Sequence, residues 1–309
     1  MTRAARHLAL VGPTAVGKSA LALEAARQLD DVELVSVDSM QVYRRMDIGT
    51  AKPTPAERAE LPHHLLDLVD PWEAFSVARF QAAAREAIAG IERRGHHALL
   101  VGGTGLYLQA VVDDLAVPGE WPAVRAELEA AAATAVGAAG LHRRLAELDP
   151  TAAARVEPTN RRRIVRALEV TLGSGRPFSS YGPGLDAYPP TSFRLAGLSS
   201  PRETLDGRIA ARLDSQLAAG FVEEVQALAA ADEPLSRTAR EALGYRELLA
   251  HLEGRCALDE AVAETVRRTR TFARRQQAWF RRDPRITWFD ADANLFAVLP
   301  ALLGHWTGR

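Results

Sequence analysis

The sequence has a single cysteine, Cys256, among its 309 residues. One cysteine cannot build an intrachain disulfide framework, and it excludes a zinc module that needs several cysteine ligands from this chain. The sequence also lacks an apolar run close to the roughly 20 residues that a membrane-spanning helix needs. We therefore expect no membrane segment.

Net charge is also nearly absent, because 38 Lys and Arg residues balance 39 Asp and Glu residues to give −1, with a pI near 6.7. This balance gives no overall basic signature for nucleic acid, but it does not exclude a local basic surface. The 47% hydrophobic and 25% charged residues are ordinary for a globular protein of one or two domains. The first expected strand starts within a few residues of the amino terminus, so we expect no secretory signal and a cytoplasmic protein.

The most informative segment is 12–19, which matches the phosphate-binding pattern G-x-x-x-x-G-K-[ST] at every fixed position. Residues 7–11 before it are typical of a buried strand, and residues 20–29 after it of a helix. Such a loop turns backbone N–H groups toward a phosphate, and the following helix adds its positive dipole end. The expected phosphate-binding residues are Gly12, Pro13, Thr14, Ala15, Val16, Gly17, Lys18 and Ser19. Lys18 supplies a charge and Ser19 can ligate Mg²⁺, but the pattern does not tell a nucleoside triphosphate from another diphosphate.

Two further strand ends are expected at the same edge of a parallel sheet. The β-branched segment 33–38 ends in Asp38, and the apolar segment 96–101 is followed by the glycine-rich turn 102–105. Ligands of open α/β sheets bind at the carboxyl ends of strands, so Asp38 and this turn are expected beside the phosphate loop. A strand-end aspartate can also serve as a helix cap, and a glycine turn can serve packing alone.

The repeated strand–loop–helix pattern predicts an α/β fold with a parallel doubly wound sheet, a helical insertion and a helical carboxyl-terminal part. We expect the core to comprise residues 1–117 and 191–309, with a strand at 193–198. The insertion is expected at 118–190, where 126–140 is nearly an alanine helix. Helices are also expected at 75–94, 205–219, 221–231, 238–248 and 266–282.

Arginines are concentrated in two places within this nearly neutral chain. Arg162, Arg163 and Arg166 share one face of an expected helix in the insertion, and eight arginines with one acid lie between 267 and 285. In the second cluster we expect one helix face to carry Arg267, Arg270, Arg274, Gln277 and Arg281. A solvated helix is the ordinary explanation of such a run. Arginines without nearby glutamates, interleaved with aromatic residues, also suit phosphate backbones and stacked bases.

These parts favour group transfer over a conventional ATPase, because only one strand ends in an acid. If Asp38 is a general base, the loop holds a leaving group. The pattern then predicts transfer of a group attached to pyrophosphate onto a nucleophile in a large polyanion.

The sequence resembles the bacterial tRNA dimethylallyltransferases, also called tRNA isopentenyltransferases, of the IPP transferase family. The segments that carry the resemblance are 12–19, 36–43, 47–53, 63–65, 102–107, 163–169, 244–246 and 274–276. The resemblance implies that dimethylallyl diphosphate donates its prenyl group to N6 of the adenosine next to the anticodon on its 3′ side (position 37). The acceptors would be tRNAs that read codons starting with U, and the product N6-dimethylallyladenosine.

The resemblance and the chemistry assign catalytic roles to Asp38, Thr104 and Lys18. An adenine amine is a poor nucleophile, because its lone pair is delocalised into the ring, so Asp38 would remove its proton. Lys18 and the loop amides would stabilise the leaving diphosphate with Mg²⁺, the expected cofactor, and Thr104 would bond to the leaving oxygen. Arg208 is an expected further cation there, with Arg212 as the alternative.

The same resemblance places the tRNA anticodon stem-loop on both basic regions, with the target adenine out of its stack. The expected tRNA-contacting residues are Asp38, Ser39, Met40, Gln41, Thr104, Arg125, Arg162, Arg163, Ile164, Val165, Arg166, Gly244, Tyr245, Arg246, Arg274, Arg275, Gln276, Trp279 and Arg281. We expect a monomer with no obligate protein partner.

Three alternatives stay open at this point. A P-loop small-molecule kinase would place ATP in the loop and use Asp38 to activate a hydroxyl group. A prenyltransferase acting on free adenine nucleotides would need no extensive basic surface. A non-catalytic P-loop RNA-binding module would not need Asp38.

Overall fold

The computed structural model describes residues 7–29, 31–133, 137–292 and 294–308. The chain divides into two compact units, one formed by 1–113 with 188–309 and the other by 114–187. The boundaries expected from the sequence were 118 and 190. No helix of the described residues has both the length and the hydropathy to cross a membrane.

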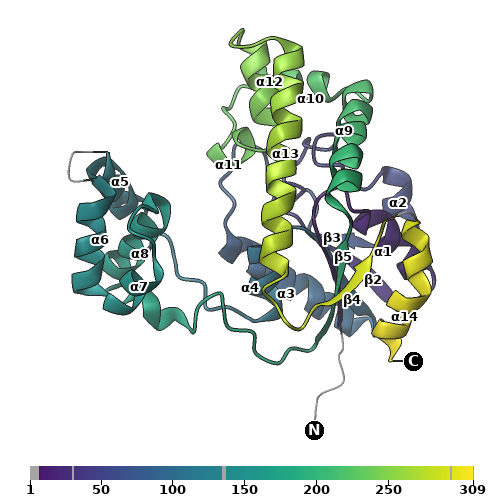
Figure 1. The fold of residues 1–309 in the computed structure, drawn as a ribbon, viewed down its shortest axis with the longest axis horizontal. Coiled ribbons are helices and arrows are strands. Elements are labelled where there is room, and N and C mark those ends of the chain that lie inside the picture. Colours follow the sequence, from purple (N-terminus) through teal and green to yellow (C-terminus); the bar gives the residue numbers. More distant parts are fainter. Residues whose placement is uncertain (1–6, 30, 134–136, 293, 309) are drawn as a thin grey trace. The chain divides into compact units, whose positions relative to one another are not determined.

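The larger unit is built on a six-stranded sheet whose strands are all parallel, in the order β3-β2-β4-β1-β5-β6 (Figure 1). Its strands are β1 His7–Val11, β2 Val32–Val37, β3 His63–His64, β4 His97–Gly102, β5 Phe193–Ser199 and β6 Thr287–Asp290. The four longer expected strands are confirmed, and the short edge strands β3 and β6 are additional. Chain order reverses around the central β1, which is the arrangement of a doubly wound sheet.

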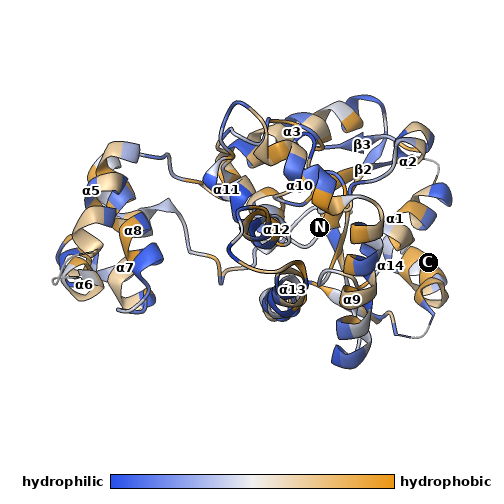
Figure 2. Ribbon diagram, turned by 90° about the horizontal axis from the view of Figure 1, so that it is seen from above, coloured by the Kyte–Doolittle hydropathy of each residue, from blue (hydrophilic) through white to orange (hydrophobic). Residues whose placement is uncertain are grey.

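Helices cover both faces of this sheet, so its strands are buried on both sides. The helices of the unit are α1 Lys18–Arg27, α2 Pro55–Glu60, α3 Val77–Arg93, α4 Gly105–Val112, α9 Arg202–Ala218, α10 Phe221–Ala229, α11 Arg237–Arg240, α12 Tyr245–Leu252, α13 Leu258–Phe280 and α14 Leu299–Thr307. Leu8 and Leu10 of β1 pack with α1 and α14, whereas Ala9 and Val11 pack with α3 and α4. Alternate residues of a strand point to opposite faces, and this alternation divides the core into two layers. Apolar residues accordingly follow the sheet and the inward sides of its helices in Figure 2.

The helix expected at 238–248 is two helices, α11 and α12, and that expectation is wrong. Gly244 separates them with φ +85°, a left-handed conformation that an α-helix cannot contain. A Cβ on Gly244 would lie 2.6 Å from the ring of Phe221. The break therefore lets α12 begin directly against α10.

The smaller unit is all-helical and has its own apolar core. Its elements are α5 Pro122–Ala132, α6 Gly137–Leu148, α7 Pro150–Arg155, α8 Arg161–Ser174 and the 3₁₀ turn η1 Phe178–Tyr181. The single alanine helix expected at 126–140 is wrong, because α5 ends at Ala132 and α6 starts at Gly137; residues 134–136 lie outside the described residues. Alanine composition favours helix but does not mark where one helix ends.

Candidate active site

The register of the sheet aligns the ends of its central strands. Val11 of β1 and Val37 of β2 both pair with Gly102, the last residue of β4 that lies between them. The next residue of each strand is therefore Gly12, Asp38 or Gly103. The phosphate-loop segment, the carboxylate and the second glycine turn thus lie side by side at the carboxyl edge of the sheet.

The phosphate loop has a backbone that glycine makes possible. Gly12 has φ +150° and Gly17 φ +104°, while Ala15 adopts the left-handed region at φ +62°. A Cβ on Gly12 would lie 2.7 Å from the carbonyl oxygen of Leu198 on β5. Gly17 is the N-cap of α1, so the amino-terminal end of this helix, with its free N–H groups, faces the loop.

Lys18 lies inside the curve of the loop, where its Nζ donates to the carbonyl oxygen of Pro13 at 2.7 Å. Burial lowers the pKa of the Lys18 ammonium group to about 7, the Arg212 guanidinium acts in the same direction, and the Asp38 carboxylate opposes both. These three charged groups therefore share one small volume. An anion with two or more charges would compensate the paired cations.

The structure distinguishes the two arginines of α9. Arg208, the expected diphosphate ligand, donates to the backbone carbonyl oxygens of Ala291 at 3.0 Å and Asp292 at 2.5 Å, so its guanidinium is held by the protein. Arg212, one helical turn on, reaches the Thr14 hydroxyl at 3.4 Å. Burial lowers the pKa of Arg212, and Asp38 raises it in turn. Both arginines therefore contact the phosphate loop, Arg212 at the Thr14 hydroxyl and Arg208 at the Val16 carbonyl oxygen at 3.5 Å, and the role expected for Arg208 stays a prediction.

Asp38 and Thr104 belong to one hydrogen-bonded turn. The Met40 N–H donates to Asp38 Oδ1 at 2.8 Å, and the Ser39 N–H donates to Thr104 Oγ1 at 3.1 Å. Among the described residues, the Met40 N–H is the hydrogen-bond donor to the half-exposed Asp38 carboxylate. Asp38 is thus oriented by backbone contacts and keeps a carboxylate oxygen for another partner.

Gln41, an expected RNA contact, is engaged within the protein. Its Oε1 accepts from the Ser36 hydroxyl at 2.7 Å, and its Nε2 donates to the carbonyl oxygens of Thr50 and Ala51 at 3.1 and 3.2 Å. These bonds close the loop that follows Asp38. The Gln41 side chain therefore supports the conformation of this loop.

Glu224 of α10 holds part of the site in place, and no motif in the sequence marks it. Its carboxylate accepts from the N–H groups of Asp47, Ile48 and Gly49 at 2.8, 2.7 and 3.2 Å, and from the Tyr245 hydroxyl at 2.6 Å. Burial and this carboxylate raise the pKa of Tyr245 far above its ordinary range, so the phenol stays a donor. The segment 47–53 of the expected family motif is thereby fixed to α10.

This contact also corrects the expected RNA-binding segment 244–246. Gly244 is buried against Phe221, and Tyr245 is 1% exposed with its hydroxyl on Glu224. Arg246 is exposed and pairs with Glu241 at 2.9 Å. The side chain of Tyr245 therefore supports the fold and does not reach RNA.

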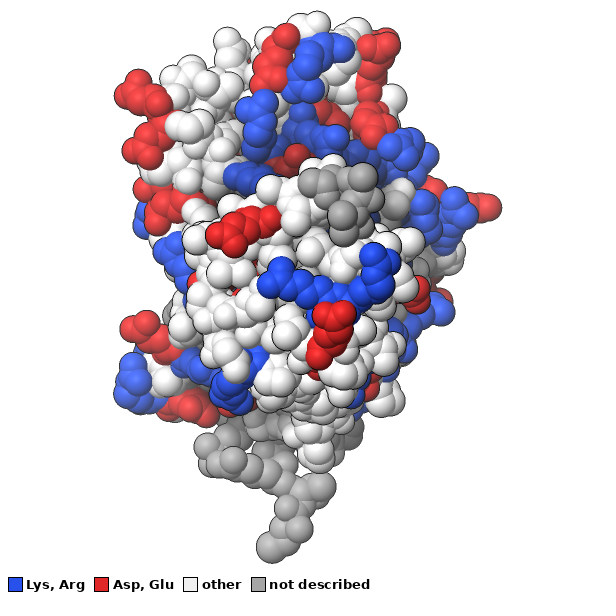
Figure 3. All heavy atoms as spheres, turned by 90° about the vertical axis from the view of Figure 1, so that its left-hand side faces the viewer, with Lys and Arg blue, Asp and Glu red and all other residues white. Residues whose placement is uncertain are grey.

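Ion pairs hold several of the arginines between 267 and 285, which corrects the expectation of uncompensated charge. The pairs are Arg267–Glu264, Arg268–Glu247, Arg270–Asp206 and Arg285–Asp113. The partners of the last three come from other parts of the chain. On the face shown in Figure 3, acidic and basic side chains likewise lie among one another.

The second half of α13 presents its cations differently. Arg274, Arg275 and Arg281 are exposed; Arg274 donates to Thr271 at 2.9 Å, and the Arg275 guanidinium lies over the Phe272 ring. Solvent-facing guanidinium groups of this kind can exchange water for phosphate oxygens. The part of α13 suited to RNA is therefore 274–281.

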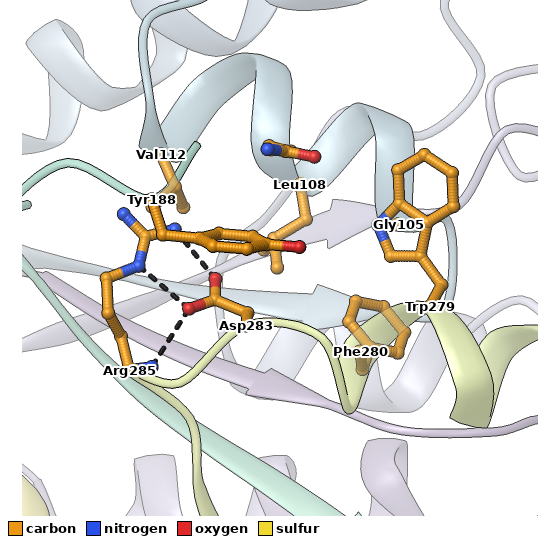
Figure 4. Close-up of a pocket in the computed structure, with 9 residues that line it drawn as sticks. Gly105, Leu108, Val112, Tyr188, Trp279, Phe280, Asp283 and Arg285 are labelled. Carbon is orange, nitrogen blue, oxygen red and sulfur yellow. Dashed lines mark hydrogen bonds and ion pairs between the residues drawn. The ribbon is translucent and has the colours of Figure 1, made fainter. Parts of the chain in front are cut away.

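Gln276 and Trp279, also expected to contact RNA, face the interior side of α13. Gln276 is 8% exposed and hydrogen-bonded to both glycine-rich turns. Trp279 is half-buried against Gly105, and with Phe280 it lines a small hollow beside α4 of about 10 Å³, room for one water molecule (Figure 4). Arg285 and Asp283 form an ion pair at the other side of this hollow.

In the smaller unit, α8 divides the expected RNA contacts into two kinds. Arg162 and Arg163 are exposed, whereas Ile164 and Val165 are 0% and 4% exposed in the core of the unit. Arg166 donates to the carbonyl oxygen of Pro118 at 2.9 Å. Contacts to RNA through the side chains of Ile164 and Val165 are thus excluded by their burial. Arg125 of α5 pairs with Glu129 at 3.1 Å on the surface.

Comparison with known proteins identifies the family of the chain. The family described as IPP transferase matches residues 41–283. A tRNA dimethylallyltransferase of Streptomyces avermitilis is 50% identical over 299 residues, covering 97% of this chain and 95% of that relative. The crystal structure of a full-length tRNA isopentenylpyrophosphate transferase from Bacillus halodurans is similar with a TM-score of 0.70 and 37% identity, over 98% of this chain and 97% of that chain.

A eukaryotic dimethylallyltransferase, studied by crystallography while acting on tRNA, is similar with a TM-score of 0.75 and 27% identity, over 93% of this chain and 74% of that chain. The family match covers well over half of the chain, and the bacterial relatives match it at nearly full length. The chain therefore belongs to the IPP transferase family.

Proposed function

We propose that the protein transfers a dimethylallyl group from dimethylallyl diphosphate to N6 of adenosine 37, next to the anticodon on its 3′ side, in tRNAs that read codons starting with U. The observation that carries this proposal is the carboxylate of Asp38, which lies at the same sheet edge as the phosphate loop, with the second glycine turn between them. The names of the relatives, tRNA dimethylallyltransferase and tRNA isopentenylpyrophosphate transferase, support tRNA as the acceptor. We place the reaction in the cytoplasm. A monomer suffices, because one chain supplies all these groups.

The leaving diphosphate is held by the phosphate loop. Its negative charge grows as the bond between the allylic carbon and the diphosphate oxygen breaks, so donors fixed in advance stabilise the transition state. Lys18, Arg212 and the backbone N–H groups at the start of α1 are those donors. Thr104 Oγ1 lies at the neighbouring turn, where it can donate to the leaving oxygen while accepting from Ser39.

Mg²⁺ is the proposed cofactor, and the residues present fit it. Mg²⁺ in such sites is bound by one or two protein oxygens together with substrate phosphates. The exposed Ser19 hydroxyl at the start of α1 offers an oxygen of this kind. Among the described residues no cluster of three or more His, Cys, Asp or Glu forms a complete cage, so phosphate oxygens would supply the rest. When bound, the ion would neutralise diphosphate charge.

Asp38 is the proposed general base. As the N6–carbon bond forms, the amine loses a proton to a carboxylate oxygen of Asp38, while the electron pair of the broken carbon–oxygen bond leaves with the diphosphate. A positioned base of this kind contributes about a hundred- to ten-thousand-fold in rate. The RNA itself would be bound by exposed arginines, Arg274, Arg275 and Arg281 in the core unit and Arg162 and Arg163 in the other.

The test is prenyl transfer with isotopically labelled dimethylallyl diphosphate, Mg²⁺ and unmodified tRNA. We expect label in N6-dimethylallyladenosine after nuclease digestion, and Asp38→Asn should lower kcat by about a hundredfold or more with tRNA affinity nearly unchanged. Asp31→Asn is the matched control, because Asp31 precedes β2 at the opposite edge of the sheet. Label on free adenine nucleotides, or phosphoryl transfer from ATP without prenylation, would contradict the proposal in favour of the two enzyme alternatives.

A further inference from the structure

Gln276 of α13 bonds to both glycine-rich turns through one amide group. Its Oε1 accepts from the Thr14 N–H of the phosphate loop at 2.8 Å, and its Nε2 donates to the Gly103 carbonyl oxygen at 2.9 Å. The side chain is 8% exposed, so water competes little for either bond. Both turns are thereby held at a distance fixed by the width of one amide.

The second turn has no spare room on this side. A Cβ on Gly103 would collide with Gln276 Nε2, and a Cβ on Gly105 would collide with the Trp279 ring. Gln276 and Trp279 lie three residues apart on the inner side of α13. The helix is thus seated directly on the turn that leads into α4.

From Gly103 the hydrogen bonds continue to the proposed base. Thr104 follows Gly103, its Oγ1 accepts from Ser39 N–H at 3.1 Å, and its own N–H donates to the Val37 carbonyl oxygen at 3.3 Å. Asp38 lies between Val37 and Ser39. The phosphate loop, Gln276, the Thr104 turn and the Asp38 turn therefore form one connected series.

We propose that Gln276 is a positioning residue that sets the spacing between the diphosphate-binding loop and the Asp38–Thr104 turns. This inference rests on the proposed function, which requires donor and acceptor at a defined separation. It replaces the RNA contact that the resemblance implied for Gln276. The exposed Arg274 and Arg275 precede Gln276 on the same helix, so RNA bound there holds the helix that sets the spacing.

The test separates positioning from packing with two substitutions of nearly constant volume. Gln276→Met removes both bonds, and Gln276→Glu keeps an acceptor for Thr14 but places an oxygen against the Gly103 carbonyl group. We expect kcat at saturating substrates to fall about 10- to 100-fold in both variants, as for a misplacement of about 1 Å, with KM for tRNA within about threefold of wild type. Assays run well below the Tm of every variant.

Gln81→Met is the matched control. Gln81 is 4% exposed and donates to the Ala110 carbonyl oxygen at 2.6 Å, away from the phosphate loop. It should lose stability with kcat intact. If the Gln276 variants also lower only Tm, the side chain serves packing, and if they raise KM for tRNA with kcat intact, it serves RNA binding; either result overturns the proposal.

A second readout does not need prenyl transfer. Inorganic diphosphate added to the wild-type protein should shift the backbone amide NMR signals of Gly103 and of Thr104, which would also contact the ligand directly. Gln276→Met should reduce the shift of Gly103, the residue bonded to Gln276, while diphosphate still binds. Wild type without prenyl transfer but with these shifts would reject the proposed function alone. Wild type with bound diphosphate and unchanged Gly103 and Thr104 signals would reject the positioning role.

Discussion

The two glycine-rich turns of the site use glycine for different physical reasons. In the phosphate loop, Gly12 and Gly17 have φ of +150° and +104°, a region that residues with a Cβ rarely adopt. In the turn after β4, Gly103 and Gly105 lie outside the left-handed region, but other parts of the chain leave no space for a Cβ. The first turn therefore needs freedom of the backbone in addition to close approach of neighbours, whereas the second needs close approach alone.

This difference assigns different work to the two turns. The backbone conformation of the phosphate loop turns N–H groups toward a ligand. In the described residues, the Lys18 ammonium group of this loop is bonded to a backbone carbonyl oxygen and to no acidic side chain. The second turn is a seat for α13 and connects the loop to Asp38. Substitutions in the first turn should therefore lower the rate of the reaction, and substitutions in the second should disturb the packing of α13.

The largest effect is expected at Lys18. Lys18→Met should lower kcat about a hundredfold or more, because it removes a cation from the developing diphosphate charge, while the unfolding temperature stays the same or rises. The matched control is Lys52, the other lysine of the sequence, which is buried and bonded to Asp47 and Asp67 at 2.6 Å. Lys52→Met should lower the unfolding temperature. If Lys18→Met kept its activity, the proposal that the first turn stabilises diphosphate charge through Lys18 would be wrong.

Double-mutant cycles test whether the two turns are limited by different factors, the backbone conformation in the first and the available space in the second. Gly105→Ala should cost about 1–3 kcal/mol of unfolding free energy through overpacking, and the cost should nearly vanish in a Trp279→Ala background. Gly17→Ala should cost about 1–2 kcal/mol from its positive φ, and Leu295→Ala should not relieve it although Leu295 lies 2.6 Å from the added Cβ. Denaturant unfolding measures all four terms. Rescue at Gly17 would show that space limits both turns.

The smallest expected effect is the pH dependence of diphosphate binding. With the pKa of Lys18 at about 7, the cation needed for binding is lost as pH rises above 7, so affinity should fall by up to about tenfold per pH unit. The ligand-free protein should instead gain stability from pH 7 toward 10, because the unfolded chain keeps this proton longer than the folded one. Both slopes should be absent in Lys18→Met.

NMR of ¹³C-labelled lysine gives the pKa directly, since the sequence contains only two lysines. Calorimetric titration of inorganic diphosphate is run on wild type and Lys18→Met between about pH 6 and 8, which is about one unit on either side of the Lys18 pKa of about 7. The difference between the two proteins removes the contribution of the ionisation of diphosphate itself. A ligand-free Lys18 signal that titrates at the ordinary lysine value would contradict the burial of this charge.

The parts of the fold that the sequence predicted are those set by local pattern. The four longer strands and the parallel doubly wound sheet follow from apolar segments, three of which end in an acid or run into a glycine. The edge strands β3 and β6, of two and four residues, are too short to show a period. The break at Gly244 was also missed, because a glycine within a helical pattern is compatible with both a break and a continuation.

The candidate site was predictable where one motif holds its residues together. The phosphate loop and Asp38 were located from strand ends, because the ends of parallel strands meet at one edge. The contact of Arg212 with the phosphate loop, and the inward positions of Tyr245 and Gln276, depend on partners far along the chain. Sequence spacing gives the face of a helix, but not which element covers that face.

The carboxylate of Glu224 has a consequence for the order of folding. It completes a loop made about 176 residues earlier, and Gln276 bonds to Thr14 across 262 residues. A ribosome-bound chain that has emerged only as far as β5 therefore has the central strands but lacks the bonds from Glu224 and Gln276 that hold the site together. The site is therefore completed last, with the carboxyl-terminal helices, and a chain whose synthesis stops before them lacks the bonds that hold the phosphate loop and the segment after Asp38 in place.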